Sequence, residues 1–145
     1  MFYLYLLLFL SLLVAVIFIT PLRFKVWVTT AVIAITALAL AVPSIAVLAG
    51  AENFKIVEMI GPLFGQESLT IDSLAAIFLL IIAIAGCATL IYSKGYLQQY
   101  LDKKSSAHIS MHYAALAILI VSMMLVVMSS GGFSFLLAWE LMTIA

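Results

Sequence analysis

Four long stretches of the chain contain no Asp, Glu, Lys or Arg, and their length limits the possible folds more than any other feature. They cover residues 1–22, 26–51, 73–93 and 111–139. A helix needs about 20 apolar residues to cross the hydrocarbon core of a bilayer. The whole chain is 68% hydrophobic and 8% charged, whereas a soluble domain is about 25% charged. We therefore predict an integral membrane protein.

The fourth stretch is long enough for two helices and contains one turn signal, the tetrapeptide "SSGG" at residues 129–132. Clusters of Ser and Gly between apolar segments are typical of loops. We therefore predict an all-α integral membrane fold of about five transmembrane helices, in a single transmembrane region over residues 1–145. The predicted helices cover residues 2–20, 26–50, 72–93, 112–128 and 132–145.

The connection between the second and third predicted helices has two short apolar segments on either side of "GPLFG" at residues 61–65. Pro62 and the flanking glycines suit a tight reversal of the chain. We predict a short external hairpin between helices two and three.

Basic residues gather in the connections after the first and third predicted helices, at Arg23, Lys25, Lys94, Lys103 and Lys104. The connection over residues 51–72 instead holds four acidic residues and one lysine. Positive residues favour the cytoplasmic side of a membrane. We therefore expect a multi-pass protein whose N-terminus and hairpin lie outside.

Several classes of function have no support in the sequence. The formal net charge is zero, which argues against binding to nucleic acid. The single cysteine, Cys87, lies in an apolar stretch, where it can form neither an internal disulfide nor a multi-cysteine metal site, and we interpret it as a packing residue. We find no glycine-rich phosphate loop and no CxxC motif, and we expect no cofactor in this chain.

Glu140 is the one charge in the apolar segment "FSFLLAWELMTIA". If a helix begins near Gly132 at the outer face, eight residues place Glu140 about 12 Å into a core that is about 30 Å thick. A charge at the centre of a bilayer costs about 2.5 to 3.5 kcal/mol, so such a residue normally faces the bundle interior or a wet cavity and has a function. We predict that Glu140 translocates protons. The alternatives are a permanently protonated packing residue and a carboxyl exposed at a helix end.

Asp72, His108 and His112 are possible accessory residues. Asp72 stands at the start of the third predicted helix, where we favour a structural capping role. His108 and His112 are four residues apart, a spacing that can bind zinc on one helical face. Because no third ligand lies nearby in the sequence, we expect no metal site, and an interfacial position or a minor role in proton relay is favoured instead.

The phrases "TIDSLAAIFLL", "LIYSKGYLQQY" and "SMMLVVMSSGGFSFLLAWELM" resemble the antiporter-like proton-translocating membrane subunits. This family includes subunits of respiratory complex I (NADH-quinone oxidoreductase, subunit 5), hydrogenase-4 component B, the formate hydrogenlyase membrane subunit and the Mrp antiporters. The resemblance covers residues 69–145, and "FLLAWELM" is its most specific part.

The resemblance implies that Glu140 is a key charge of the proton path and that Asp72 matches the aspartate that opens the third helix. It also implies that the chain is the N-terminal portion of an antiporter-like fold of about fourteen helices, built from inverted repeats. A lysine on a later helix would oppose Glu140. The partners would be the lipid bilayer and other membrane subunits of a multi-subunit complex, in the inner membrane of a prokaryote. Any redox site of that oxidoreductase complex would lie on other subunits.

Three other readings stay open. The chain could be a membrane scaffold or assembly subunit that transports nothing, or a truncated fragment without function. A weaker alternative is a quinone-site subunit, based on Tyr96, His108 and His112 near the inner surface.

Overall fold

The computed structural model describes residues 2–61, 65–98 and 105–145 of the chain. These ranges contain five helices and one antiparallel two-stranded hairpin, so the expectation of a mostly helical protein is confirmed. In chain order the elements are α1 (Phe2–Ile19), α2 (Leu22–Leu48), β1 (Phe54–Gly61), β2 (Gly65–Ile71), α3 (Ser73–Gln98), α4 (Ser106–Met128) and α5 (Gly132–Ile144).

Within the described residues, three helical segments are long and apolar enough to cross a membrane, at Trp27–Leu48, Ser73–Ser93 and Ser106–Met128. Two shorter apolar segments accompany them, at Leu8–Ile19 and Gly132–Ile144. The lengths therefore support a membrane protein with three candidate spans, in agreement with the composition.

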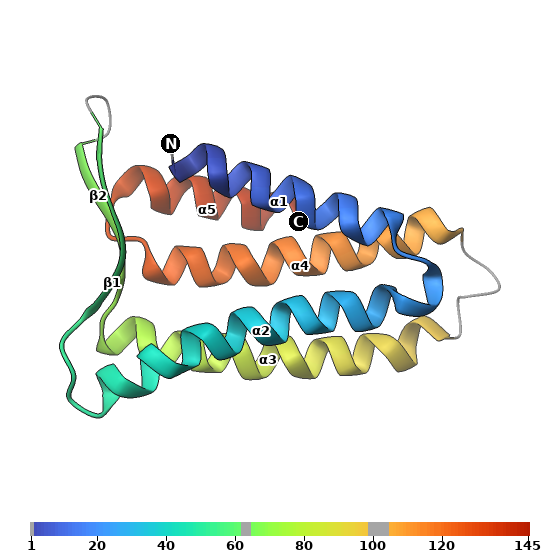
Figure 1. Cartoon of the computed structure of the whole chain (residues 1–145), viewed down its shortest axis with the longest axis horizontal. Helices are drawn as coiled ribbons and strands as arrows, with labels where there is room; N and C mark the ends of the chain where they lie inside the picture. Colours follow the sequence, from blue (N-terminus) through green and yellow to red (C-terminus); the bar gives the residue numbers. More distant parts are fainter. Residues whose placement is uncertain (1, 62–64, 99–104) are drawn as a thin grey trace.

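The helices lie side by side along one long axis, and their connections fall at the two ends of the bundle (Figure 1). We call the end that carries β1, β2 and the turn between α4 and α5 the hairpin end. The α1–α2 and α3–α4 connections lie at the other end, which we call the opposite end. α1 begins toward the hairpin end, so successive helices alternate in direction (Figure 1).

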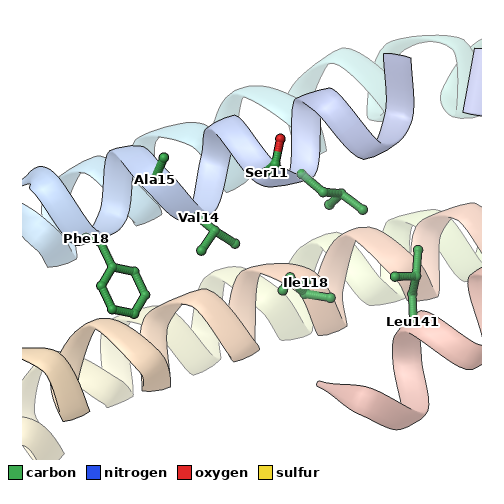
Figure 2. A pocket seen from close by; sticks show the side chains of 7 residues that line it. Ser11, Val14, Ala15, Phe18, Ile118 and Leu141 are labelled. Atoms are coloured by element: carbon green, nitrogen blue, oxygen red, sulfur yellow. The ribbon is translucent and has the colours of Figure 1, made fainter. Parts of the chain in front are cut away.

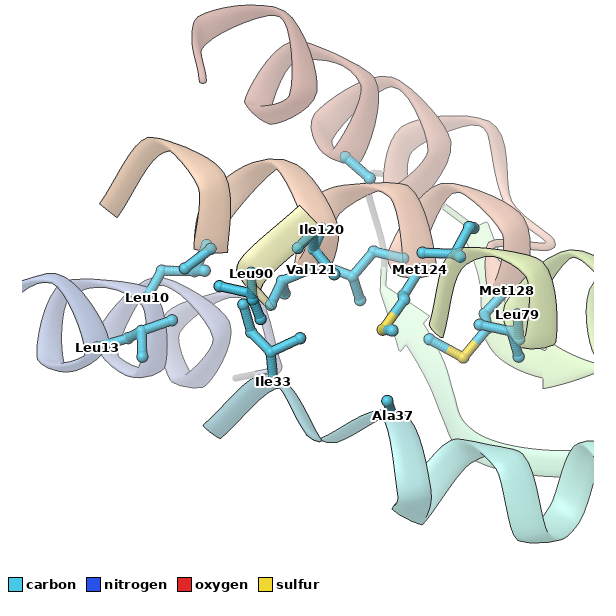
Figure 3. Packing of buried hydrophobic residues seen from close by; sticks show 14 of the residues in the cluster. Leu10, Leu13, Ile33, Ala37, Leu79, Leu90, Ile120, Val121, Met124 and Met128 are labelled. Carbon is cyan, nitrogen blue, oxygen red and sulfur yellow. The ribbon is translucent and has the colours of Figure 1, made fainter. Parts of the chain in front are cut away.

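α4 is the central helix, since it contacts each of the other four helices. Small side chains on its buried faces, including Ala114, Ala117 and Ser122, let neighbouring helices come close. The approach of α3 is especially close at Gly86, where an added Cβ would lie 3.3 Å from Ile120 Cδ1. Figure 3 shows apolar side chains of several helices, such as Leu13, Ile33, Leu79 and Met124, meeting around α4.

The faces of α2 and α3 that point away from the bundle are apolar. Ile35 and Leu38 are each 68% exposed, and Ile84 and Ile91 are each 72% exposed. Contiguous apolar surface of this kind is unfavourable in water. The helical hydroxyls that could disturb it are satisfied within their own helices, as when Thr89 Oγ1 donates to Ala85 O at 2.8 Å. Both features suit a hydrocarbon environment.

Three helix ends differ from the predicted bounds by more than two residues. α2 begins at Leu22 instead of residue 26, directly after Pro21, which is tolerated at a helix start because its missing N–H is not needed there. α4 begins at Ser106 instead of residue 112, and α3 continues to Gln98 instead of residue 93. Charged and polar residues therefore lie in helical turns that extend beyond the apolar stretches.

The predicted hairpin is present, with pairs running from Phe54↔Ile71 to Gly61↔Gly65 and a register shift between Lys55 and Val57. Its predicted turn at Pro62 lies outside the described residues. Leu69 and Ile71 of β2 are buried, and β2 contacts α2, α3, α4 and α5. The second strand therefore covers the hairpin end of the bundle, next to the start of α5.

Candidate functional site on the fifth helix

The N-terminus of α5 is capped by a side chain from the hairpin. The Glu67 carboxylate accepts hydrogen bonds from Phe133 N at 2.9 Å and Ser134 N at 3.1 Å. Ser134 Oγ also donates to Glu67 Oε2. Only 4% of Glu67 is exposed, so its charge depends on these donors and on the positive end of the helix dipole.

Two serines hold the turn between α4 and α5 against β2. Ser130 N donates to Ser68 O at 3.0 Å, and Ser68 N donates to Ser130 Oγ at 3.1 Å. Their hydroxyl oxygens lie 2.7 Å apart. The neighbouring residues Leu69 and Ser129 form an antiparallel bridge. The "SSGG" segment is thus a turn, as predicted, but it also extends the pairing of the hairpin.

Glu140 lies on the exposed face of α5. Ser134 and Ala138 form the buried face of this helix, and Glu140 follows Ala138 by two positions, which is roughly 200° around the helix. The expectation that the carboxyl faces the interior of the bundle is therefore not met by the described chain. Its neighbours on this side are apolar and aromatic, with the rings of Phe135 and Trp139 5.9 Å apart.

No hydrogen bond or ion pair reaches the Glu140 carboxyl from the part of the chain that the structure describes. At this residue, Thr143 Oγ1 donates to the main-chain oxygen Glu140 O at 2.8 Å. In a bilayer, this carboxyl would face lipid unless another helix covers it.

An open apolar groove of about 450 Å³ lies between α1, α4 and α5 (Figure 2). Its lining is Leu10, Ser11, Val14, Ala15, Phe18, Ile118 and Leu141. The hydroxyl of Ser11 donates to Leu8 O within α1, so the groove presents almost no free polar group. It suits an alkyl chain or an apolar helix face.

The accessory candidates do not gather around Glu140. Asp72 caps α3, because its Oδ1 accepts a hydrogen bond from Ala75 N at 2.7 Å. His108 Nδ1 lies 2.8 Å from Ser105 Oγ at the start of α4, and His112 Nε2 lies 3.1 Å from Ser93 Oγ of α3. The histidines therefore belong to the opposite end of the bundle, where α4 begins (Figure 1).

The described residues contain no group of three His, Cys, Asp or Glu side chains that could hold a metal ion. Cys87 is half-buried on α3 as a free thiol. Tyr96 is exposed on α3 and stacks on Tyr92, with ring centroids 6.2 Å apart.

Lys25 is a buried cation, although its position beside Arg23 predicted only a basic loop. Its Nζ donates to Ile17 O at 3.0 Å and Phe18 O at 3.3 Å, near the C-terminus of α1. It also donates to Ser110 Oγ of α4. The residue is 1% exposed. Burial lowers the pKa of Lys25, which precedes the candidate span of α2, while the carbonyl end of α1 stabilises its charged form.

A sequence signal for Lys25 did exist. Lys25, Thr29, Ile33 and Ala37 follow one another at intervals of four, and all of them are buried. Residues four apart share one face of a helix, so extending the apolar face of α2 backward places Lys25 inside the bundle. For Glu67, no local sequence pattern indicates its contact with Phe133 of α5, which lies 66 residues later in the chain.

Comparison with known proteins adds no identification. No protein-family model matches the chain, and no curated protein matches it. The resemblance to the antiporter-like subunits stays a prediction from the residues quoted above.

Proposed function

We propose that this chain is part of a proton-translocating or cation-translocating subunit of a membrane-bound respiratory or hydrogenase-type complex, in which Glu140 takes up and releases the ion. The proposal rests on the surroundings of the Glu140 carboxyl. Glu140 lies on an apolar, exposed face of α5, and no described residue donates a hydrogen bond to its side chain.

The energetic argument concerns the two protonation states of this carboxyl. An ionised group in hydrocarbon costs about 2.5 to 3.5 kcal/mol on insertion scales, and nothing in the described chain offsets that cost. A carboxyl held by neither a fixed donor nor a fixed cation can change its protonation when its surroundings change. A covering helix with a lysine, as the resemblance implies, would provide the alternating partner.

The same proposal includes the arrangement in the membrane. α1 and α5 would also cross the bilayer, which gives about five spans in the N-terminal portion of an antiporter-like fold of about fourteen helices. The N-terminus and the hairpin would lie outside the inner membrane of a prokaryote. Support comes from the alternating direction of the helices (Figure 1). Further support comes from basic residues in and beside the connections at the opposite end, such as Arg23 and Lys94.

A membrane scaffold is the second candidate. The observations that favour it are the open apolar groove and the exposed aromatic pair of Phe135 and Trp139, which both suit packing against other membrane helices. In this case Glu140 would stay protonated and hydrogen-bonded to a partner helix.

Replacement of Glu140 by Gln separates the two candidates, because Gln keeps the shape and hydrogen-bonding capacity but has no titratable proton. The measurement is ion uptake by inside-out membrane vesicles from cells that make the protein with its native partners. We expect uptake to fall about tenfold or more, as for loss of a proton-transferring group, while the amount of assembled complex stays unchanged.

Glu52→Gln is the matched control, since Glu52 is an exposed acidic residue outside the helices. It should leave uptake unchanged. Normal uptake by the Glu140→Gln protein in an assembled complex would contradict the transport proposal and favour the scaffold.

A further inference from the structure

We propose that Glu67 is a positioning residue for α5. In this proposal the absence of a side chain at Gly131 leaves the space that the Glu67 carboxylate needs. The hairpin thereby fixes the start of the helix that carries Glu140. We call the contact between Glu67 and residues 131–134 the α5 latch. The latch rests on observed contacts alone. Only its consequence for Glu140 rests on the proposed function.

The start of α5 cannot cap itself. The first N–H groups of any helix lack partners within the helix, and the N-cap position here is Gly131, which has no side chain. The Glu67 carboxylate takes this role from the hairpin by accepting from Phe133 N and Ser134 N. Hydrogen bonds to a carboxylate are stronger than neutral ones, so one side chain joins β2 to α5.

Gly131 is required for steric reasons. A Cβ at this position would lie 2.4 Å from Glu67 Cγ, 2.6 Å from Cδ and 2.8 Å from Oε1, so a methyl group would push the carboxylate away from the helix. Its φ of −110° is open to all residues. An alanine at position 131 therefore disturbs the latch and not the backbone conformation.

The neighbouring glycine is a matched control. A Cβ at Gly132 would meet no atom within 4 Å. Gly131→Ala and Gly132→Ala add the same methyl group one residue apart, and only the first reaches Glu67. A difference between these two variants isolates the latch from any general effect of removing a glycine.

The serine pair beside the latch provides the reporter. Ser68 and Ser130 have hydroxyl oxygens 2.7 Å apart, so cysteines at both positions would lie close enough to form a disulfide on oxidation. Replacing them removes the hydroxyl contacts but keeps the main-chain bond from Ser130 N to Ser68 O. Glu67 then remains as the side-chain link between β2 and α5. A Cys87→Ser background removes the native thiol.

The experiment measures the rate of oxidative cross-linking of Ser68→Cys and Ser130→Cys in membranes, in four versions of the protein: unchanged, Glu67→Ala, Gly131→Ala and the combination of the two. We expect each single change to slow cross-linking about threefold or more, and the combination to be no slower than Glu67→Ala alone, since both changes remove one contact. Gly132→Ala should keep the original rate. Additive effects, or equal effects of the two glycine variants, would overturn the proposal.

A second readout reports on the position of Glu140. A hydrophobic carbodiimide modifies protonated carboxyls in apolar surroundings, and mass spectrometry gives the rate at Glu140. Glu67→Ala and Gly131→Ala should change this rate about threefold or more, whereas Gly132→Ala should not. Unchanged rates in both latch variants would overturn positioning of Glu140. If Glu140 is unmodified even in the unaltered protein, the proposed function fails, and the cross-linking rates still decide whether the latch exists.

Discussion

Two glutamates, Glu67 at the start of α5 and Glu140 further along it, have opposite surroundings. At the start, the Glu67 carboxylate is 4% exposed and accepts hydrogen bonds from two main-chain N–H groups and a hydroxyl. In the middle, Glu140 lies on the outer face with no donor among the described residues. The first arrangement fixes a charge in place, whereas the second leaves a carboxyl available to a proton or a partner. The comparison separates a glutamate that holds the start of α5 from one that we propose acts in ion transport.

The largest expected effect tests the structural half of this comparison. Glu67→Ala leaves the first N–H groups of α5 and the Ser134 hydroxyl without their acceptor. Because hydrogen bonds to a charged group contribute about 1.5 to 3 kcal/mol each and compensate one another in part, we expect a loss of about 2 to 3 kcal/mol in the free energy of unfolding. Denaturant unfolding in detergent micelles measures it. A loss below about 0.5 kcal/mol would mean that the carboxylate does not hold α5.

Lys25 provides the corresponding test at the opposite end, where a cation meets the C-terminus of α1 instead of an anion meeting the N-terminus of α5. Lys25→Met keeps the apolar stem but leaves Ile17 O, Phe18 O and Ser110 Oγ without their donor. We expect a loss of about 1 to 2 kcal/mol in the same unfolding assay. Ser110→Ala removes only one acceptor and should cost less, and the reverse order would contradict the capping role of Lys25.

Asp72 provides a comparison with Glu67 at the same end of the bundle. Asp72 is exposed and caps α3 through a residue only three positions away. Asp72→Ala removes the acceptor for Ala75 N and should lower the free energy of unfolding by about 1 kcal/mol. Asp72→Asn retains an oxygen acceptor and should stay close to the original stability. A loss as large as that of Glu67→Ala would show that Asp72 does more than cap α3.

The smallest expected effect belongs to Glu140. Since no described contact depends on its carboxyl, Glu140→Gln should change the free energy of unfolding of the isolated protein by less than about 0.5 kcal/mol. The same substitution is the one expected to lower ion uptake about tenfold or more. A large loss of stability would instead assign Glu140 to the structure, and the contrast with Glu67 would disappear.

The sequence predicts the contacts of some residues and not of others. The contacts it predicts join residues close together in the chain, whereas those it misses join residues far apart in the chain. The cap at Asp72 involves a residue three positions away, so local spacing was sufficient. The hairpin was predicted from glycine and proline between apolar segments, and the turn at residues 129–132 from serine and glycine. The latch could not be predicted in this way, because Glu67 contacts residues 66 and 67 positions later, and only the packed bundle brings them together.

The sequence pattern also does not predict whether Glu140 lies on the buried or the exposed face of α5. The mean apolarity of α5 is similar on all sides, so periodicity does not identify its buried face. Contacts of α5 with α4 and β2 decide it, since Ser134 and Ala138 are the buried residues of this helix. Lys25 is an intermediate case. Its spacing to Thr29 and Ile33 indicates that it is buried, but the sequence does not predict that carbonyl groups of α1 accept its hydrogen bonds.

The most direct test of the central claim compares the reactivity of Glu140 toward two carbodiimides in native membranes, one soluble in lipid and one soluble only in water, with modification located by mass spectrometry. The claim predicts that the lipid-soluble reagent modifies Glu140 and stops ion uptake. It also predicts that the water-soluble reagent modifies Glu52 but spares Glu140. Modification of Glu140 by the water-soluble reagent as fast as Glu52, or its complete resistance to the lipid-soluble reagent at acidic pH, would contradict the assignment of Glu140 to an ion path.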